Sequence, residues 1–508
     1  MKKAKVLLIS PNLKGMNDGI NRIQPSLGLM IIAQKLLDDG HVVKIHDAAL
    51  EGWNNRKIID PKKNIITIGQ SNDEIRKLLS DFSPDIVAIS VLFSNFLDSA
   101  HLIASLAKEV DKNIKVVLGG NHISNSISDY SFALINKDSN LPDFIEDLDD
   151  DNIDFALVGE GETSMIQLSN AIVNNNDDDV SKISGLVKKI GHKKYFINSK
   201  RDRHEMNLIP RPARHLVNME AYFKVGAFHS SKSKSNRVLN VMCSRGCPER
   251  CNFCTTPEMW GNKVRWRTIE HIMDEIRNDV RDYRIGEIQF EDDTLTLHKK
   301  NLDSLCKELE KIGLPWCTPN GTKVNYNLKK QMEMYKNMAA SGCYQITLGC
   351  ESGVQRVLDD IINKRLQLNT IYPSIENAKK AGMFCHTFWI LGYPGETFEE
   401  MQKTVDFAMN SGADSFSFAI LVPLPGTPIY RKVVKEKLWW GREDSSIDNK
   451  IFCSSLIKID GFNGSEEFER FVNEINIKAN LLLKNKDPKR FESKYGDKVE
   501  KHNFQRQT

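Results

Sequence analysis

The stretch that decides the fold is CSRGCPERCNFC, residues 243–254. Within it, Cys247, Cys251 and Cys254 are separated by three and then two residues, shortly after the apolar segment Val238–Val241. Thiolates at this spacing can each bind one iron of a cubic iron-sulfur cluster, and the fourth iron then has no protein ligand. A small molecule with an amino and a carboxylate group could chelate that open iron and receive an electron.

Two other interpretations of these cysteines stay open. The first is a four-cysteine zinc site that uses Cys243 as its additional ligand, although structural zinc prefers paired short spacings. The second is a chance cluster that binds no metal. If the iron-sulfur interpretation holds, Cys243 is a packing thiol, because a fourth thiolate would close the open iron.

The cysteines lie at the start of the second of two αβ series. Short apolar strands alternate with helix-length segments over residues 1–200 and again over residues 237–435, a pattern typical of parallel sheets covered on both faces. The sequence therefore predicts an α/β protein with a doubly wound, Rossmann-like domain at 1–200, a linker at 201–236, a complete or partial TIM-type βα barrel at 237–435 and a helical region at 436–508. The expected strands are 6–9, 42–45, 86–91, 116–118, 155–158, 238–241, 287–290, 344–348, 384–390 and 416–421.

Composition narrows the class of protein. The 508 residues are 40% hydrophobic and 27% charged with a formal net charge of +3, and no apolar run is long enough to span a membrane. The scattered charges predict neither a nucleic-acid nor a lipid partner. The run Met1–Lys5 leads into a strand too short for a signal-peptide core, and closely spaced cysteines suit a reducing compartment, so we expect a cytoplasmic protein. Segments 136–154 and 174–179, rich in Asp and Asn, are expected to be solvated insertions.

With Phe253 directly before its last cysteine, the motif resembles that of the radical S-adenosylmethionine superfamily. Further strand-end elements follow in the order of that superfamily, at Phe290–Asp293, Gly349–Gly353, Leu391–Thr397 and Pro423–Pro428. The resemblance implies a 4Fe-4S cluster whose open iron binds S-adenosylmethionine. It assigns to this cofactor site Phe253, Asp292, Asp293, Glu351, Ser352, Gly392 and Pro425. Asp292 or Asp293 could instead cap a helix.

The first domain resembles that of the cobalamin-binding radical S-adenosylmethionine class, on the elements Pro25–Leu29, Ser90–Ser94, Gly119–His122 and Gly159–Glu162. Many other cobalamin proteins give cobalt a histidine from an Asp-x-His-x-x-Gly loop, which this sequence lacks, so cobalamin is expected to have no histidine as lower ligand. No Gly-x-Gly-x-x-Gly follows the first strand, which disfavours nicotinamide binding. The resemblance assigns to the cobalamin site Ser90, Ser94, Gly119, Gly120, Gly159, Glu160 and Gly161. His122 is expected to be structural.

The resemblance implies a methyltransferase. In such a reaction the reduced cluster cleaves S-adenosylmethionine to a deoxyadenosyl radical, which removes hydrogen from a substrate carbon that methylcobalamin then methylates. The implied partners are a small-molecule or peptide substrate and an external electron donor of the flavodoxin or ferredoxin type. Two alternatives stay open: the same scaffold could perform oxidation, cyclisation or rearrangement, or the chain could be a non-catalytic iron-sulfur or zinc-binding regulatory protein.

Overall fold

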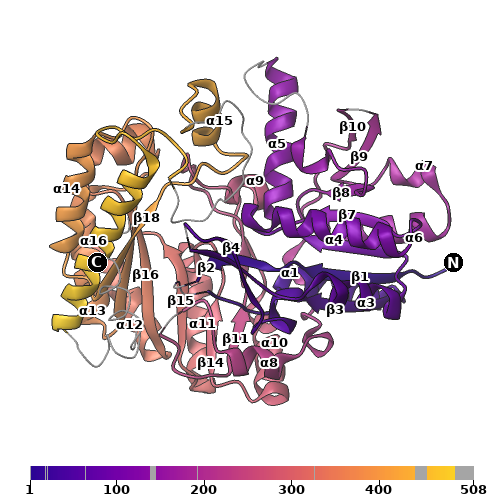
Figure 1. Ribbon diagram of the computed structural model, residues 1–508. Coiled ribbons are helices and arrows are strands. Elements are labelled where there is room, and N and C mark those ends of the chain that lie inside the picture. The colour runs from indigo at the N-terminus through magenta and orange to yellow at the C-terminus, as the bar shows by residue number, and fades with distance from the viewer. Residues whose placement is uncertain are drawn as a thin grey trace.

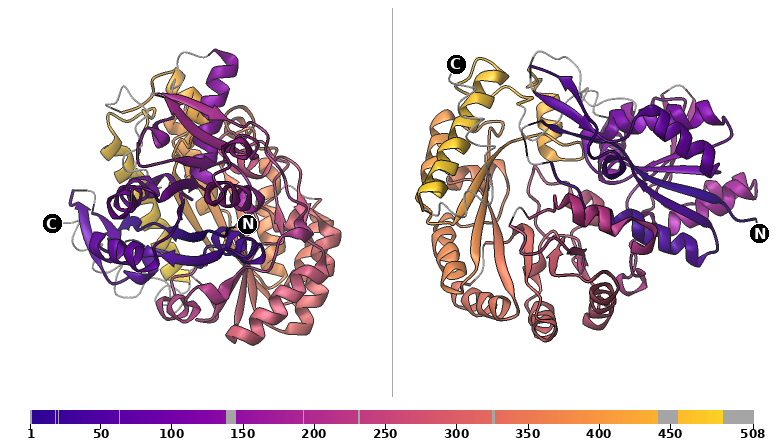
Figure 2. Two further views of the ribbon diagram at one scale, coloured as in Figure 1. Left: turned by 90° about the vertical axis from the view of Figure 1, so that its right-hand side faces the viewer. Right: turned by 60° about the horizontal axis from the view of Figure 1, so that its bottom comes forward.

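The computed structural model describes residues 2–486 apart from 18, 20, 63, 138–144, 192, 231, 325–326 and 441–454. Two αβ units, each built around its own sheet, lie side by side (Figure 1). The first unit is purple and lies on the right of Figure 1, and the second runs from pink to yellow on the left. The second view of Figure 2 also separates the two sheets.

The first sheet has seven strands in the order β10-β9-β8-β7-β6-β1-β3. The strands are β1 (Lys5–Ser10), β3 (Val42–Asp47), β6 (Ile86–Ser90), β7 (Lys115–Gly119), β8 (Phe155–Leu157), β9 (Leu186–Gly191) and β10 (Lys194–Ile197). The five from β8 to β3 are parallel, and β9 and β10 add antiparallel to the edge. The parallel strands follow the doubly wound order 2-1-3-4-5, whose ligands bind outside the carboxyl ends of the strands.

Successive side chains of each strand point to opposite faces of this sheet, and helices cover both faces. The helices are α1 (Leu27–Asp38), α2 (Ala48–Glu51), α3 (Asn72–Phe82), α4 (Leu97–Val110), α5 (Asn121–Asn136), α6 (Gly161–Val173) and α7 (Asp177–Val180). Leu7 and Ile9 of β1 pack in one core with α3, α4 and α5. Val6 and Leu8 pack in another with α1 and α6. The predicted doubly wound fold is confirmed. The small antiparallel sheet of β2 (Leu13–Met16), β5 (Ile65–Ile68) and β4 (Arg56–Asp60) was not predicted.

The second sheet contains six parallel strands in the order β11-β14-β15-β16-β17-β18. They are β11 (Val238–Val241), β14 (Glu287–Phe290), β15 (Trp316–Thr322), β16 (Cys343–Glu351), β17 (Phe384–Leu391) and β18 (Ser415–Ile420). The helices that follow these strands are α10 (Ile269–Tyr283), α11 (Lys299–Ile312), α12 (Leu328–Ala340), α13 (Ile371–Lys380), α14 (Phe398–Met409) and α15 (Pro428–Lys435). Among the described residues β18 does not pair with β11, so the barrel is partial. Strand β15 was missed, because Pro319 and Gly321 interrupt its apolar pattern.

The open edge of the barrel is closed by the long helix α16 (Ser465–Lys486), which lies against β18 (Figure 1). The side chain of Asn476 accepts a hydrogen bond from the backbone N–H of Phe418 at 3.0 Å and donates one to its carbonyl at 2.9 Å. The side-chain amide of Asn476 therefore takes the place of a neighbouring strand, because it bonds to both the N–H and the carbonyl of Phe418. No helix of the described residues combines the length and the apolar composition needed to cross a membrane.

The connecting segment 201–236 is packed against both units and contains α8 (Met219–Val225). Arg214 is fully buried, and its guanidinium donates to Asp279 Oδ2 at 2.9 Å and to the carbonyl of Asn240 at 2.6 Å. Asn240 in turn donates to the carbonyl of Pro25 in the first unit. Arg214 of the segment and Asn240 of β11 thus form a line of buried hydrogen bonds that reaches the first unit.

The expectation that residues 136–154 form a solvated insertion was wrong for the part that the structure describes. Ile145, Leu148 and Ile153 are buried in the core under α4 and α5, and Asp147 is also buried. The few hydrophobic residues of this segment are buried in the core, although most of the residues between them are Asp and Asn. Residues 138–144 lie outside the described residues.

Candidate functional site

The loop that carries the three cysteines follows β11 and is tied to the barrel at several points. Cys247 donates its backbone N–H to the carbonyl of Gly261 at 3.3 Å, and Cys254 donates to Cys251 at 3.0 Å. Asn252 bonds to the carbonyls of Ile361 and Ile362. These contacts hold the loop in one shape, so the thiols are preorganised for a shared ligand.

At the start of the cysteine loop, the backbone of Gly246 lies close to that of Lys263. Gly246 has φ of +102°, and a Cβ there would lie 2.5 Å from the carbonyl oxygen of Lys263. A side chain at this position would therefore displace the start of the loop, just before Cys247.

The electrostatics of the thiols indicate that they need a cation. Burial raises the pKa of Cys247, Cys251 and Cys254. For Cys251, burial together with the charges of the neighbouring thiolates outweighs the lowering effect of Lys364 and brings the pKa to about 12. Three bare thiolates are therefore unfavourable here, whereas iron would compensate their charge.

The spread of the sulfur atoms separates a cluster from a single ion. The Sγ atoms of Cys247, Cys251 and Cys254 do not all lie within 4.8 Å of one another, whereas ligands of one zinc ion, with Zn–S bonds of about 2.3 Å, would lie about 3.8 Å apart. Cys243 is completely buried in the barrel core. Because the fourth thiol is enclosed in the core, Cys247, Cys251 and Cys254 are the three thiols that suit a cluster with one open iron better than a four-cysteine zinc site.

The two predicted aspartates lie beside this loop. Asp292 accepts hydrogen bonds from the backbone N–H of Cys243 at 3.0 Å and from the hydroxyl of Ser244 at 2.5 Å. Asp293 accepts from Thr256 at 3.0 Å, in the short helix α9 (Thr256–Trp260) after the last cysteine. Burial raises the pKa of Asp292 to about 7 and that of Asp293 to about 6, although the hydrogen bonds that the two carboxylates accept lower both values. Neither aspartate caps a helix.

At the end of β16, Glu351 and Ser352 have different surroundings. Glu351 has φ of +65° and accepts a hydrogen bond from Lys364 at 2.8 Å. Burial lowers the pKa of Lys364, but the charges of Glu351 and Cys251 hold it above its ordinary value. Ser352 is completely buried, with its hydroxyl 3.1 Å from that of Thr404. Lys364 was missed, because no sequence pattern marks it.

Gly392 and Phe253 lie on the same side of the barrel. A Cβ on Gly392 would lie 2.8 Å from the ring of Phe468 in α16, and its N–H donates to Glu396. The rings of Phe253 and Tyr393 are 6.1 Å apart. Packing against α16 thus accounts for this glycine, and the cluster loop contacts the end of β17 through aromatic rings.

A pocket lies where the carboxyl ends of the first sheet face the cluster loop. Ser94 and Pro425, predicted for two different cofactors, both line it. Leu92 and Phe93 at the rim are 48% and 46% exposed, which suits a flat, largely apolar ligand such as a corrin. The other lining residues are Asn95, Asn121, His122, Asn125, Thr255, Val422 and Leu424.

The glycines expected at the rim lie at strand ends. Ser90 pairs with Gly119 across β6 and β7. Gly120 has φ of +105°, and a Cβ there would lie 2.6 Å from the carbonyl oxygen of Val91. Gly159 has φ of +83°, and Gly161 begins α6. Among these glycines only Gly120 is packed against neighbouring backbone too closely for a side chain, and the contacts of all these residues with cobalamin stay a prediction.

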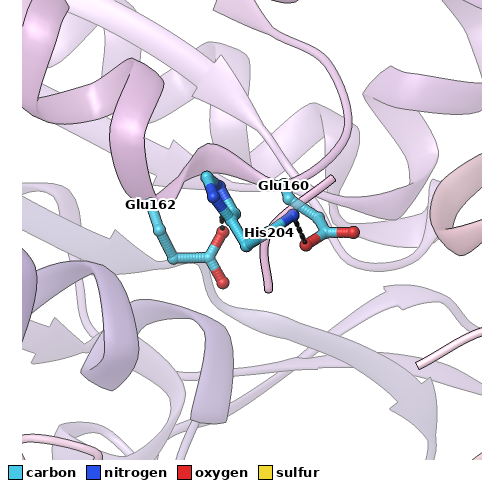
Figure 3. Close-up of side chains that lie close together, drawn as sticks. All are labelled: Glu160, Glu162 and His204. Carbon is cyan, nitrogen blue, oxygen red and sulfur yellow. Dashed lines mark hydrogen bonds and ion pairs between the residues drawn. The ribbon is translucent and has the colours of Figure 1, made fainter. Parts of the chain in front are cut away.

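Glu160 lies in a buried charge cluster between the units. It pairs with Arg245 at 3.0 Å and with Arg265, while Glu162 pairs with Arg245 at 2.6 Å. His204 Nε2 lies 3.5 Å from Glu162 Oε2 (Figure 3). Ligand atoms of the two glutamates and His204 are all within 4.8 Å of one another, but two arginines neutralise the carboxylates, so the cluster holds the units together.

Comparisons with known proteins match both units. The model of the radical SAM superfamily matches residues 241–408, and that of the B12 binding domain matches residues 14–135. A cytidylyl-2-hydroxyethylphosphonate methyltransferase from Streptomyces wedmorensis is 32% identical over 498 residues, which is 93% of this chain and 89% of the relative. This chain belongs to the cobalamin-dependent radical S-adenosylmethionine methyltransferases.

Two solved structures share the fold of this methyltransferase. The radical S-adenosylmethionine methyltransferase TsrM from Kitasatospora setae, with cobalamin and a 4Fe-4S cluster bound, has a TM-score of 0.60 at 17% identity and covers 86% of this chain and 75% of TsrM. The cobalamin-dependent radical enzyme OxsB has a TM-score of 0.61 at 15% identity and covers 86% of this chain but only 56% of OxsB. The cofactors of this methyltransferase are a 4Fe-4S cluster, S-adenosylmethionine and cobalamin. When bound, the cluster supplies the electron that cleaves S-adenosylmethionine, and cobalamin supplies the methyl group.

Proposed function

We propose that this methyltransferase adds a methyl group to a carbon of a small, polar, nucleotide-activated molecule of the 2-hydroxyethylphosphonate type. The observation that carries the methyl transfer is the direct contact of the two cofactor regions. Asn121 at the rim of the first sheet donates a 3.2 Å hydrogen bond to Thr255, which directly follows Cys254. A substrate in the adjoining pocket would meet both regions, as the reaction requires.

The substrate class is supported by the relative that acts on a cytidylyl phosphonate, which is similar over nearly its full length. The inside of the barrel is also polar. Ser230 bonds to Gln289 of β14 and to Gln345 of β16, two strands separated by β15, so these side chains meet within the curved face. Nearby His229 pairs with Glu291 at 2.8 Å. Ser230, Gln289 and Gln345 are buried and bonded to one another, so the support for the substrate class comes from the relative.

Residue roles follow from the geometry. Cys247, Cys251 and Cys254 are proposed as the cluster ligands, with Phe253, Asp292, Asp293, Glu351 and Pro425 around S-adenosylmethionine. We propose that Ser352 and Gly392 act by packing, because Thr404 and Phe468 fill the space beside them. We propose that Ser90, Ser94 and the rim glycines 119, 120, 159 and 161 lie around cobalamin. Glu160, in contrast, acts by joining the two units.

The surroundings of the enzyme also belong to the proposal. A cluster with one open iron needs a reducing compartment and a low-potential electron donor, so we propose the cytoplasm and a flavodoxin or ferredoxin as donor. We propose no nucleic-acid partner, because a net charge of +3 is small for 508 residues.

Anaerobic turnover tests this function. The full chain, reconstituted with iron, sulfide and cobalamin, is incubated with S-adenosylmethionine, a reductant and cytidylyl-2-hydroxyethylphosphonate, and the products are identified by mass spectrometry. We expect deoxyadenosine, S-adenosylhomocysteine and a substrate heavier by one methylene, all dependent on cobalamin. Deoxyadenosine without S-adenosylhomocysteine would refute methyl transfer and favour oxidation, cyclisation or rearrangement. A methylated product from another polar substrate alone would refute only the substrate class.

A further inference from the structure

A chain of three buried polar side chains ends at the pocket between the two cofactor regions. His122, at the start of α5, places Nδ1 2.9 Å from the hydroxyl of Ser94 and Nε2 3.2 Å from Asp147 Oδ2. Ser94, His122 and Asp147 are 8%, 3% and 4% exposed. Ser94 and His122 line the pocket, whereas Asp147 lies behind them in the segment that the sequence predicts to be solvated.

The hydrogen bond of this chain joins His122 Nδ1 to Ser94, whereas Nε2 and Asp147 Oδ2 approach each other as an ion pair without hydrogen-bond geometry. The charge of Asp147 determines which way the hydrogen bond to Ser94 runs. A negatively charged carboxylate close to Nε2 favours the form of His122 that carries its proton on that nitrogen. The bare Nδ1 then accepts the hydroxyl proton of Ser94. With its proton directed at His122, the Ser94 oxygen keeps its lone pairs for a partner in the pocket.

The same geometry prevents His122 from acting as a metal ligand. Both of its ring nitrogens already face a partner, and a histidine that binds cobalt must present a free nitrogen. His122 is therefore suited to act through Ser94, in the way that an outer carboxylate orients the histidines of metal sites.

We propose that Asp147 and His122 form a positioning relay that holds the Ser94 hydroxyl as a hydrogen-bond acceptor toward the face of cobalamin that rests on this domain. Ser94 is the member that faces the cofactor, and the other two act only through it. The proposal rests on cobalamin as the cofactor of this domain and does not depend on which substrate is methylated.

Spectroscopy of bound cobalamin tests the relay without substrate or S-adenosylmethionine. The full chain is loaded with hydroxocobalamin and reduced to the Co(II) form, and its electron paramagnetic resonance spectrum is recorded for wild type, Ser94→Ala, His122→Gln and Asp147→Asn. We expect each variant to shift the cobalt signal in the same direction, because each removes or misdirects the same acceptor.

The chain offers a matched control pair. His101 on α4 lies 2.7 Å from Asp150, a second His–Asp pair of this domain that is absent from the pocket lining. His101→Gln and Asp150→Asn should leave the spectrum of bound cobalamin as in wild type. They also measure how far the loss of any His–Asp pair alters the domain.

The double variant Ser94→Ala/His122→Gln separates a relay from two independent effects. Because His122 acts through Ser94, the double variant should show the spectrum of Ser94→Ala alone, whereas independent effects would add. Additive shifts, or a Ser94→Ala spectrum equal to that of wild type with cobalamin bound, would overturn the proposal. Failure of methyl transfer in the turnover experiment would leave this spectroscopic result unchanged, so the two proposals fail separately.

Discussion

Arg245 Nη2 donates a 2.6 Å hydrogen bond to Glu162 Oε1 across the boundary between the two units, two residues before Cys247. Both side chains are buried. Burial alone would raise the pKa of Glu162, but the charge of Arg245 holds it below its ordinary value. The start of the cluster loop is therefore anchored to the cobalamin domain by a compensated pair of charges.

Glu162→Gln should destabilise the protein, because it leaves the charge of Arg245 buried with one ionic partner fewer. The expected loss is ~3 kcal/mol of unfolding free energy, measured by denaturant unfolding of the full chain. Glu220→Gln, which breaks the exposed pair with Arg237, is the control and should leave the unfolding midpoint unchanged. If the two substitutions lowered the unfolding free energy equally, burial of the Glu162–Arg245 pair would not be the cause of the loss.

Single alanine substitutions should divide the cysteines into two groups. Cys247→Ala, Cys251→Ala and Cys254→Ala are each expected to abolish the brown absorbance of the anaerobically reconstituted cluster and the cleavage of S-adenosylmethionine. Cys243→Ala should retain both, because this thiol is enclosed by the barrel core. Loss of the cluster in Cys243→Ala would show that a fourth thiolate takes part.

Gly120→Ala should strain the cobalamin rim. At φ of +105° the added Cβ would lie 2.6 Å from the carbonyl oxygen of Val91, at a cost of ~1–3 kcal/mol. We expect a lower unfolding midpoint and weaker cobalamin binding by titration. At Gly28 in α1 no atom lies within 4 Å of a new Cβ, so Gly28→Ala should stabilise by ~0.5–1 kcal/mol. A Gly120→Ala variant as stable as Gly28→Ala would refute the strain.

Asp47 should make stability depend on pH. Its carboxylate accepts from Tyr222 at 2.7 Å, and burial raises its pKa to about 6, against the hydrogen bonds that lower it. The folded state therefore binds a proton more tightly than the unfolded state, and this stability, complete below about pH 4, is lost as pH rises through about 6.

Comparison with Asp47→Asn measures this contribution. Between about pH 5 and about pH 8, wild type should lose roughly 1 kcal/mol more unfolding free energy than Asp47→Asn, whose side chain does not titrate. Parallel pH profiles of the two proteins would contradict the raised pKa.

Asn476→Ala should expose the open edge of the barrel. Without the amide, the N–H and carbonyl of Phe418 lose both partners, which we expect to cost ~2 kcal/mol and to speed hydrogen exchange at the Phe418 amide. Glu474→Ala alters an exposed position on the same helix and serves as the control. Unchanged exchange at Phe418 would show that this amide does not protect the edge.

Regular strands and helices could be predicted where the pattern was local and continuous. Strand β14 begins at Glu287 and ends at Phe290, as predicted. Strand β15 was missed because Pro319 and Gly321 lower its strand propensity, while pairing with β14 and β16 compensates for them. Neighbouring strands decide the conformation of such a segment.

The sequence by itself determined the class of chemistry, because three thiols within eight residues must lie close together in any fold of the chain. It also determined the two αβ units, since the strand period and the helix spacing are local properties. Only the tertiary structure decided which distant side chains meet: Lys364 near Cys251, Arg245 against Glu162, and Asp147 behind His122. Such contacts depend on strand order and on the docking of the two units, and no local pattern of residues encodes either.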